Sequence, residues 1–194
     1  MPTRIAEENI EFTFGDRWVV EKYDSHADTQ PFIGVVEHRK AVDFVGLHEH
    51  VAFLIEVKDY RGFRIANRPK TNGALNEAIA QKVHDTLAGL LLTHRRNPAT
   101  RLWRESLNAC RLRSGQVRVV LWLEDDALFR TTTPNGKSAA AIFTARLKQH
   151  LKWFPGKVLV VNRAFSARGL PDVTATDLPG AAGHGGPAVG KGRK

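Results

Sequence analysis

Two carboxylates and a lysine, Asp43, Glu56 and Lys58, are the residues of this chain whose types and spacing best suit chemistry. They stand on two stretches rich in valine, leucine, isoleucine and phenylalanine, separated by Gly46 and the polar residues 48–50. β-Branched and aromatic residues favour strands, and a glycine followed by polar residues favours a turn. The segment therefore predicts a β-hairpin that carries all three ionisable side chains.

The length of the hairpin loop decides how these side chains face one another. With a two-residue loop at residues 49–50, Asp43 lies directly across from Glu56, with Cβ atoms roughly 5 Å apart. A four-residue loop places Asp43 opposite Leu54 instead, which leaves it diagonal to Glu56 on the same face. Side chains alternate along a strand, so Lys58 shares the face of Glu56. The alternate positions point into a core: Phe53, Ile55 and Val57.

Two carboxylates that are held together in this way predict a cation site. They repel each other and raise each other's pKa, a cost that a divalent cation removes. Mg²⁺ prefers one or two carboxylates together with water and substrate phosphate oxygens. A neighbouring lysine can orient or help deprotonate a metal-bound water, or stabilise charge that develops on a phosphate. The three residues Asp43, Glu56 and Lys58 therefore predict metal-assisted hydrolysis of a phosphodiester.

The arrangement resembles the PD-(D/E)XK nuclease superfamily, which includes restriction endonucleases, repair nucleases and resolvases. In that resemblance Asp43 matches the first carboxylate, Glu56 the second and Lys58 the lysine. The leading proline of the motif is replaced by Val42. The resemblance implies that Mg²⁺, with Mn²⁺ as a substitute, is bound by Asp43, Glu56 and the backbone carbonyl of Val57.

The same resemblance implies two further site residues. Members often place an acidic residue on their first helix, and Glu8 is the candidate here, with the glutamates at positions 7 and 11 as alternatives. Members also often carry a polar residue on the helix after the motif that reaches the metal-bound water or the phosphate. Gln81 is the candidate for that role, with Lys82 or His84 as alternatives. An exposed helical glutamate explains Glu8 better than a role in the site does, and solvation of a helix surface explains Gln81 about as well as a catalytic role.

Three basic residues just past the motif, Arg61, Arg64 and Lys70, are the best candidates for contacts with phosphates. Such contacts position a nucleic acid without reading its sequence. The histidines at positions 48 and 50 fit a polar turn better than a metal-binding pair. No helix-turn-helix, zinc-finger or aromatic RNA-binding signature is visible, so sequence-specific recognition is not expected.

The composition favours a polyanionic partner. The 194 residues include 29 lysines and arginines against 20 acidic residues, which gives a net charge of +9 and a pI near 10.1. Such a balance suits nucleic acid or an anionic membrane surface. Cys110 is the only cysteine, which excludes an intrachain disulfide and a cysteine-based zinc site. No apolar run resembles a signal peptide or spans a bilayer, so we expect a cytoplasmic protein.

The hydrophobic pattern predicts an α/β fold in which helices flank both faces of a central mixed β-sheet. The resemblance implies that this sheet and its helices form a restriction-endonuclease-like core. Residues 1–167 are expected to form this domain, and the Gly/Ala/Pro-rich residues 168–194 a disordered tail. Helices are expected in residues 74–92, 102–110 and 138–153, and a short one within residues 3–14. Strands are expected in residues 17–23, the hairpin, 116–123 and 156–162, with 34–37 as part of a strand or its lead-in.

These observations predict a Mg²⁺-dependent nuclease, an endonuclease rather than an exonuclease, with DNA as its substrate. A chain of this length has little room for a separate specificity domain. We therefore expect a homodimer, or a subunit of a larger bacterial defence or repair complex. The alternative is a non-catalytic module that retains the nuclease fold and binds nucleic acid or a partner protein. A subunit that becomes active only when its partner delivers a trigger is a third hypothesis.

Overall fold

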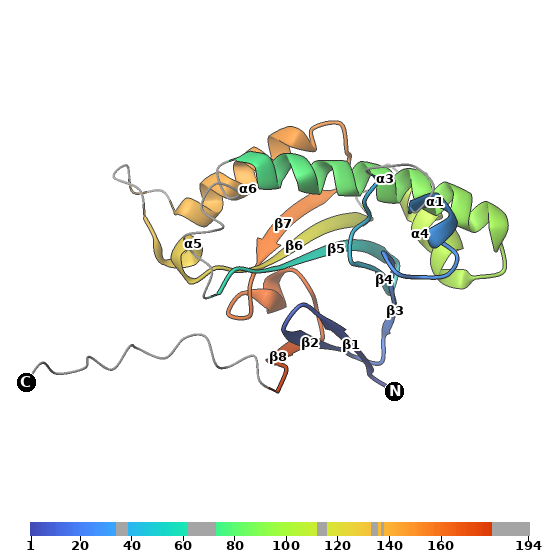
Figure 1. Cartoon of the computed structure of the whole chain (residues 1–194), viewed down its shortest axis with the longest axis horizontal. Helices are drawn as coiled ribbons and strands as arrows, with labels where there is room; N and C mark the ends of the chain where they lie inside the picture. Colours follow the sequence, from blue (N-terminus) through green and yellow to red (C-terminus); the bar gives the residue numbers. More distant parts are fainter. Residues whose placement is uncertain (34–38, 62–72, 112–115, 133–135, 137, 180–194) are drawn as a thin grey trace, which may run out of the picture.

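A mixed five-stranded β-sheet forms the centre of the molecule, in the order β3-β4-β5-β6-β7. The computed structural model describes residues 1–33, 39–61, 73–111, 116–132, 136 and 138–179 (Figure 1). The first three strands of the sheet are antiparallel, and β5, β6 and β7 are parallel. Their bounds are β3 Trp18–Lys22, β4 Phe44–His48, β5 Val51–Asp59, β6 Val117–Glu124 and β7 Lys157–Val161.

The β4–β5 hairpin has the two-residue loop that the sequence allowed. His48 pairs with Val51, so only residues 49 and 50 lie between the strands. Glu49 has a φ of 58°, a left-handed conformation of the kind that tight hairpin turns require. Phe44 pairs with Ile55, and the same register carried one residue further sets Asp43 against Glu56.

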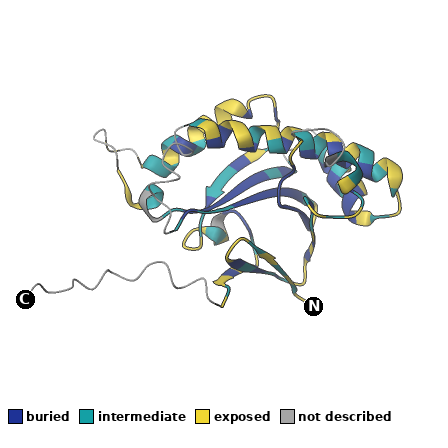
Figure 2. Ribbon diagram, viewed as in Figure 1, coloured by how far each residue is buried: buried dark blue, intermediate teal, exposed yellow. Residues whose placement is uncertain are grey.

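A layer of helices covers one face of this sheet (Figure 1). Ile79, Val83 and Leu90 recur on one side of the longest helix and are buried against Leu54 and Leu121 of the sheet. Figure 2 shows the same division, with exposed residues on the outer side of the helices and buried strands beneath them. The main helices are α3 Leu75–Arg96, α4 Arg101–Arg111 and α6 Ala139–His150, and the short ones are α1 Gln30–Ile33, α5 Asp126–Arg130 and the 3₁₀ helix η2 Ser166–Arg168.

A second, three-stranded sheet covers the opposite face, where helices had been expected. It runs in the order β1-β2-β8, and both pairs of strands are antiparallel. Its side chains form a core with the central sheet, in which Phe12 meets Trp122 edge to face at 5.0 Å between ring centroids. The bounds are β1 Thr3–Glu7, β2 Ile10–Phe14 and β8 Val173–Asp177. Among the described residues, the central sheet therefore lies between a helical layer and a small sheet.

Two expectations about the ends of the chain are corrected by this small sheet. Residues 3–14 form the β1–β2 hairpin instead of a short helix, because Ile10, Phe12 and Phe14 alternate along β2 and are all buried. The expected boundary at residue 168 falls inside folded structure, because Val173 and Ala175 of β8 are buried in the same core. The expected strand segment at residues 34–37 lies outside the described residues, as do residues 180–194.

The remaining expected elements are present with shifts of a few residues at their ends. The helices expected at 74–92, 102–110 and 138–153 correspond to α3, α4 and α6, and the strands expected at 116–123 and 156–162 to β6 and β7. Within the part of the chain that the structure describes, no helix combines the length and hydropathy needed to cross a membrane.

Candidate functional site

Asp43 and Glu56 lie together beneath the surface, between the central sheet and α3. Glu56 is 1% exposed and Asp43 is 3% exposed. The backbone N–H of Val57 donates a hydrogen bond of 2.6 Å to Oδ2 of Asp43, which fixes the Asp43 carboxylate against β5. Glu56 points to the helical side of the sheet because it alternates with Ile55 and Val57, which face the small sheet. The hairpin register therefore brings two buried acidic groups to one place.

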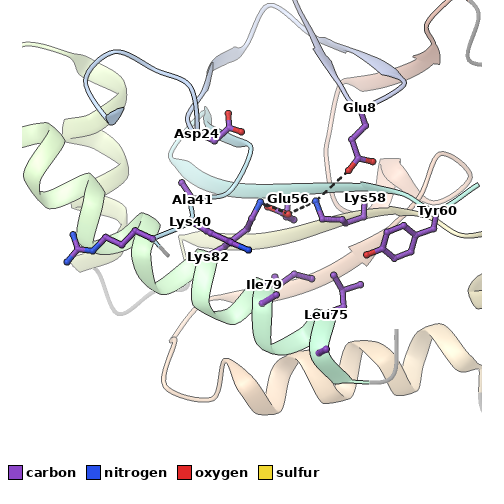
Figure 3. A pocket seen from close by; sticks show the side chains of 13 residues that line it. Glu8, Asp24, Lys40, Ala41, Glu56, Lys58, Tyr60, Leu75, Ile79 and Lys82 are labelled. Carbon is purple, nitrogen blue, oxygen red and sulfur yellow. Dashed lines mark hydrogen bonds and ion pairs between the residues drawn. The ribbon is translucent and has the colours of Figure 1, made fainter. Parts of the chain in front are cut away.

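Two lysine ammonium groups neutralise these acids. Lys82 reaches across from α3, and its Nζ lies 2.7 Å and 2.8 Å from the two carboxylate oxygens of Glu56 (Figure 3). The same Nζ lies 3.4 Å from Oδ1 of Asp43. Lys58 approaches from β5 itself, with Nζ 2.7 Å from Oε1 of Glu56. The Lys58 ammonium also donates a 2.7 Å hydrogen bond to the backbone oxygen of Val57. The Lys82 ammonium thus contacts both carboxylates at once.

The electrostatics of the site follow from burial. Burial raises the pKa of Glu56 to about 7, the nearby charge of Asp43 adds to the effect, and Lys58 and Lys82 oppose it. Burial alone would lower the pKa of Lys58, but the carboxylates of Glu56 and Asp43 outweigh it and raise that pKa above its usual value. Lys58 is therefore a permanent positive charge near neutral pH, whereas Glu56 gains or loses its proton there.

Glu8 reaches the same site from the turn of the β1–β2 hairpin. Its backbone is left-handed, with a φ of 52°, and one carboxylate oxygen accepts a hydrogen bond from the backbone N–H of Asp59. The other oxygen lies 3.6 Å from Nζ of Lys58. Burial raises the pKa of Glu8, although its bond to Asp59 and the Lys58 charge oppose that shift. Glu8 had been expected on a helix, and the structure places it on a β-turn beside the site.

These groups line a pocket of about 740 Å³ (Figure 3). Glu8, Glu56, Lys58 and Lys82 are among its charged lining residues, and Leu75, Ala78 and Ile79 of α3 supply apolar ones. Asp24, from the segment after β3, is a further acidic group in the lining. Its pKa is raised by burial and then by the charge of Asp43.

Two of the sequence-predicted residues are occupied elsewhere. Gln81 is exposed, and its Nε2 donates a hydrogen bond of 2.8 Å to Oδ1 of Asp85, outside the pocket. Arg61 is paired with Asp59 and Asp177, each at 2.7 Å, and so joins the end of β5 to β8. Neither side chain is aimed at the carboxylates in this arrangement.

Two other expected phosphate-binding residues, Arg64 and Lys70, lie outside the described residues. Lys82 was named only as an alternative to Gln81, and the geometry favours it because consecutive residues of a helix point about 100° apart. A signal for Lys82 was present in the sequence, since Leu75, Ile79 and Thr86 place this lysine on the apolar face of α3. Asp24 had no comparable signal.

The oxygen atoms gathered here suit a hard divalent cation. Carboxylates of Asp43 and Glu56 with the backbone oxygen of Val57 are ligands of the kind that Mg²⁺ and Mn²⁺ accept, with water completing the shell. The Lys82 ammonium, which contacts both carboxylates, shows that positive charge is stabilised at this position. No cluster of three or more histidine, cysteine, aspartate or glutamate side chains is arranged as a metal site within the described segments.

Comparison with known proteins gives little further information. No family model matches the chain, and no solved structure matches it. A curated relative is a cysteine–tRNA ligase of Neisseria meningitidis serogroup A / serotype 4A, which is 25% identical over 175 residues. The similarity covers 75% of this chain and 24% of the ligase. The chain thus spans about a quarter of the length of the curated relative that it matches.

Proposed function

We propose that this chain is a Mg²⁺-dependent nuclease that hydrolyses phosphodiester bonds of nucleic acid, with DNA as the expected substrate. The observation that carries the proposal is the convergence of Glu56, Lys58 and Lys82 in one pocket, where Nζ atoms of both lysines lie 2.7 Å from Glu56. Asp43 is buried beside them, with its Oδ1 3.4 Å from Nζ of Lys82. The net charge of +9 supports a polyanionic substrate. The hairpin followed by alternating helices and parallel strands supports a restriction-endonuclease-like core.

The chain's own residues divide the work of such a reaction. Mg²⁺ bound by Asp43, Glu56 and the Val57 oxygen would polarise the scissile phosphate and lower the pKa of bound water. Lys58 is held in place by the Val57 oxygen and by Glu56. Because its pKa is raised, Lys58 supplies positive charge to the phosphate and does not serve as the base.

The likeness to a cysteine–tRNA ligase bears only on the choice of substrates. That protein acts on tRNA according to its name, and the similarity covers about a quarter of it. RNA therefore belongs beside DNA in any test of cleavage. We also propose that the chain acts as a homodimer, or as a subunit of a bacterial defence or repair complex, because 194 residues leave little room for a separate specificity domain.

The test is cleavage of labelled single-stranded, duplex and branched DNA and RNA in the presence of Mg²⁺ or Mn²⁺. Glu56→Gln is expected to lower the rate at least about 1,000-fold, because it removes a ligand charge at the reacting centre. Binding of the same substrates in EDTA is expected to change by less than about twofold. Glu105→Gln is the matched control, since Glu105 is an exposed glutamate of α4 outside the pocket. Unchanged Mg²⁺-dependent cutting by Glu56→Gln would refute the proposal.

A second candidate is a nucleic-acid-binding module without catalysis. The observation that favours it is the pairing of the two buried acids with two ammonium groups, which balances their charge without a metal. This module would show no cleavage of any substrate in the panel, and its binding would weaken steeply as salt concentration rises.

A further inference from the structure

The reacting groups lie at the bottom of the pocket and not on the outer surface. Glu56 and Asp43 are almost fully buried, and the lysine side chains that contact them are 18% exposed for Lys82 and 23% exposed for Lys58. A phosphate must come within hydrogen-bonding distance, about 3 Å, to use these groups. The scissile phosphate must therefore enter the pocket together with the sugar and base attached to it.

One wall of the pocket is apolar. Leu75, Ala78 and Ile79 come from the first turns of α3, and Ala74 directly precedes that helix. Tyr60, the residue after β5, also lines the pocket, and Figure 3 shows it with Leu75 and Ile79. A sugar–phosphate backbone presents charged phosphate oxygens, for which such a wall offers no partner. The flat face of a nucleobase is apolar and packs on aromatic and aliphatic side chains. The wall therefore fits a base, placed beside the phosphate site.

The opposite rim of the pocket is basic. Arg39 and Lys40 are exposed and line the same cavity as Lys82. They are placed to contact a phosphate next to the scissile one, since backbone contacts of this kind position a strand. The pocket thus combines a basic rim, charged groups in its interior and an apolar wall. A nucleotide strand, with its phosphates and its flat bases, can contact all three surfaces.

The size of the pocket suits a single unpaired nucleotide. A volume of about 740 Å³ is in the range of sites that enclose one small molecule. A duplex keeps its bases stacked in its interior, and enzymes that reach one base in a pocket must first take it out of the stack. A strand that is already unpaired meets no such barrier.

We propose that this site takes an unpaired nucleotide of a single-stranded nucleic acid segment, an inference that rests on the proposed function. The base packs against Tyr60 and the apolar wall of α3. The scissile phosphate lies at Lys58 and Lys82, and the next phosphate lies at Arg39 and Lys40.

The first experiment measures binding without cleavage. A fluorescent 12-residue oligothymidine and a blunt 12-base-pair duplex are titrated with the protein in EDTA, and anisotropy is recorded. Ala78→Glu places a carboxylate on the apolar wall, and Ala88→Glu places one at an exposed position of the same helix outside the pocket. Ala78→Glu is expected to weaken binding of the single strand at least about tenfold, and Ala88→Glu less than about twofold. Melting temperatures of both variants verify folding.

The second experiment measures cleavage of the same two substrates in Mg²⁺. The wild-type protein is expected to cut the single strand at least about tenfold faster than the blunt duplex, in kcat/KM. Equal cleavage of both substrates, or equal effects of Ala78→Glu and Ala88→Glu, would overturn this inference and leave the nuclease proposal intact. Preferential single-strand binding that is lost in Ala78→Glu, with no cleavage in Mg²⁺ or Mn²⁺, would support the inference and refute the nuclease proposal.

Discussion

The two faces of β5 are buried to the same extent but in opposite chemical environments. Ile55 is 0% exposed and packs between the two sheets, whereas its neighbour Glu56 is 1% exposed and faces α3. Removing an isoleucine side chain from water stabilises the fold by about 1.5–3 kcal/mol. Removing a carboxylate from water costs free energy, which is reflected in the pKa of about 7 for Glu56. Equal burial therefore stabilises one face of the strand and raises the pKa of a carboxyl group on the other.

The largest expected effect is a loss of stability when a side chain on the apolar face of β5 is shortened. Ile55→Ala should lower the free energy of unfolding by about 3 kcal/mol, because it leaves a cavity between the sheets. Metal-dependent cleavage per folded molecule should remain, since Ile55 does not line the pocket. Urea denaturation and initial cleavage rates measure the two properties. Val19→Ala, at an exposed position of β3, is the control and should change stability by less than about 0.5 kcal/mol. An Ile55→Ala protein that is as stable as wild type but inactive would contradict this assignment of stability to the apolar face and of cleavage to the charged face.

A smaller effect concerns pH and the charged face. Because the pKa of Glu56 is raised to about 7 in the folded protein, the fold binds its proton more tightly than the unfolded chain does. The stability that Glu56 contributes is full below about pH 4.5 and is lost as pH rises through about 7. Metal-free wild-type protein should thus lose about 2 kcal/mol relative to Glu56→Gln between pH 5 and pH 8.

Urea denaturation at a series of pH values measures this difference, and subtraction of the Glu56→Gln curve removes the titration of distant groups. Glu105→Gln is again the control, because Glu105 lies on α4 outside the pocket. Parallel curves for wild type and Glu56→Gln would show that Glu56 is not the group that titrates near neutrality.

The smallest expected effect concerns the Lys82 ammonium group, which contacts the two buried carboxylates. Lys82→Met should strengthen Mn²⁺ binding about tenfold, equivalent to about 1.4 kcal/mol, because the ammonium that contacts Glu56 and Asp43 no longer competes with the metal. Cleavage should nevertheless fall, since a charge that faces the phosphate is lost. Calorimetric titration with Mn²⁺ measures the affinity, with Lys148→Met on the exposed side of α6 as the control. Unchanged or weaker Mn²⁺ binding by Lys82→Met would show that the Lys82 ammonium does not compete with the metal for the carboxylates.

The sequence predicted those parts of the fold that depend on short-range periodicity. Alternation along β5 and the polar turn near residues 49–50 predicted the hairpin and the shared face of its ionisable residues, and the apolar repeat from Leu75 to Leu90 predicted α3. The sequence left the hairpin register open between a two-residue and a four-residue loop, and the structure has the two-residue loop. The small sheet could not be predicted in this way, because β2 pairs with β8 from the far end of the chain. The glutamates among residues 3–14 suggested a helix, although Ile10, Phe12 and Phe14 already alternated.

The candidate site also contains residues placed by local structure and residues placed by contacts between distant parts of the chain. Asp43, Glu56 and Lys58 come from one local hairpin, so their proximity follows from its register. The choice between Gln81 and Lys82 depends on how α3 is rotated against the sheet, which tertiary packing decides. Glu8 was identified by type, but its route to the site depends on a hairpin that the sequence did not predict.

The placement of Glu8 has a consequence for any shortened form of this protein. The turn that carries Glu8 is attached to the last described strand, since the backbone N–H of Leu178 donates to the oxygen of Asn9 at 3.0 Å, and Asp177 pairs with Arg61 at 2.7 Å. Trimming the chain at residue 168 would keep every residue of the recognised motif and still remove the neighbour that supports this turn. If such a truncated protein failed to cut nucleic acid, the loss of β8 and of the support that it gives to the Glu8 turn would explain the failure. That result would not show that Asp43, Glu56 and Lys58 are inactive in the full chain.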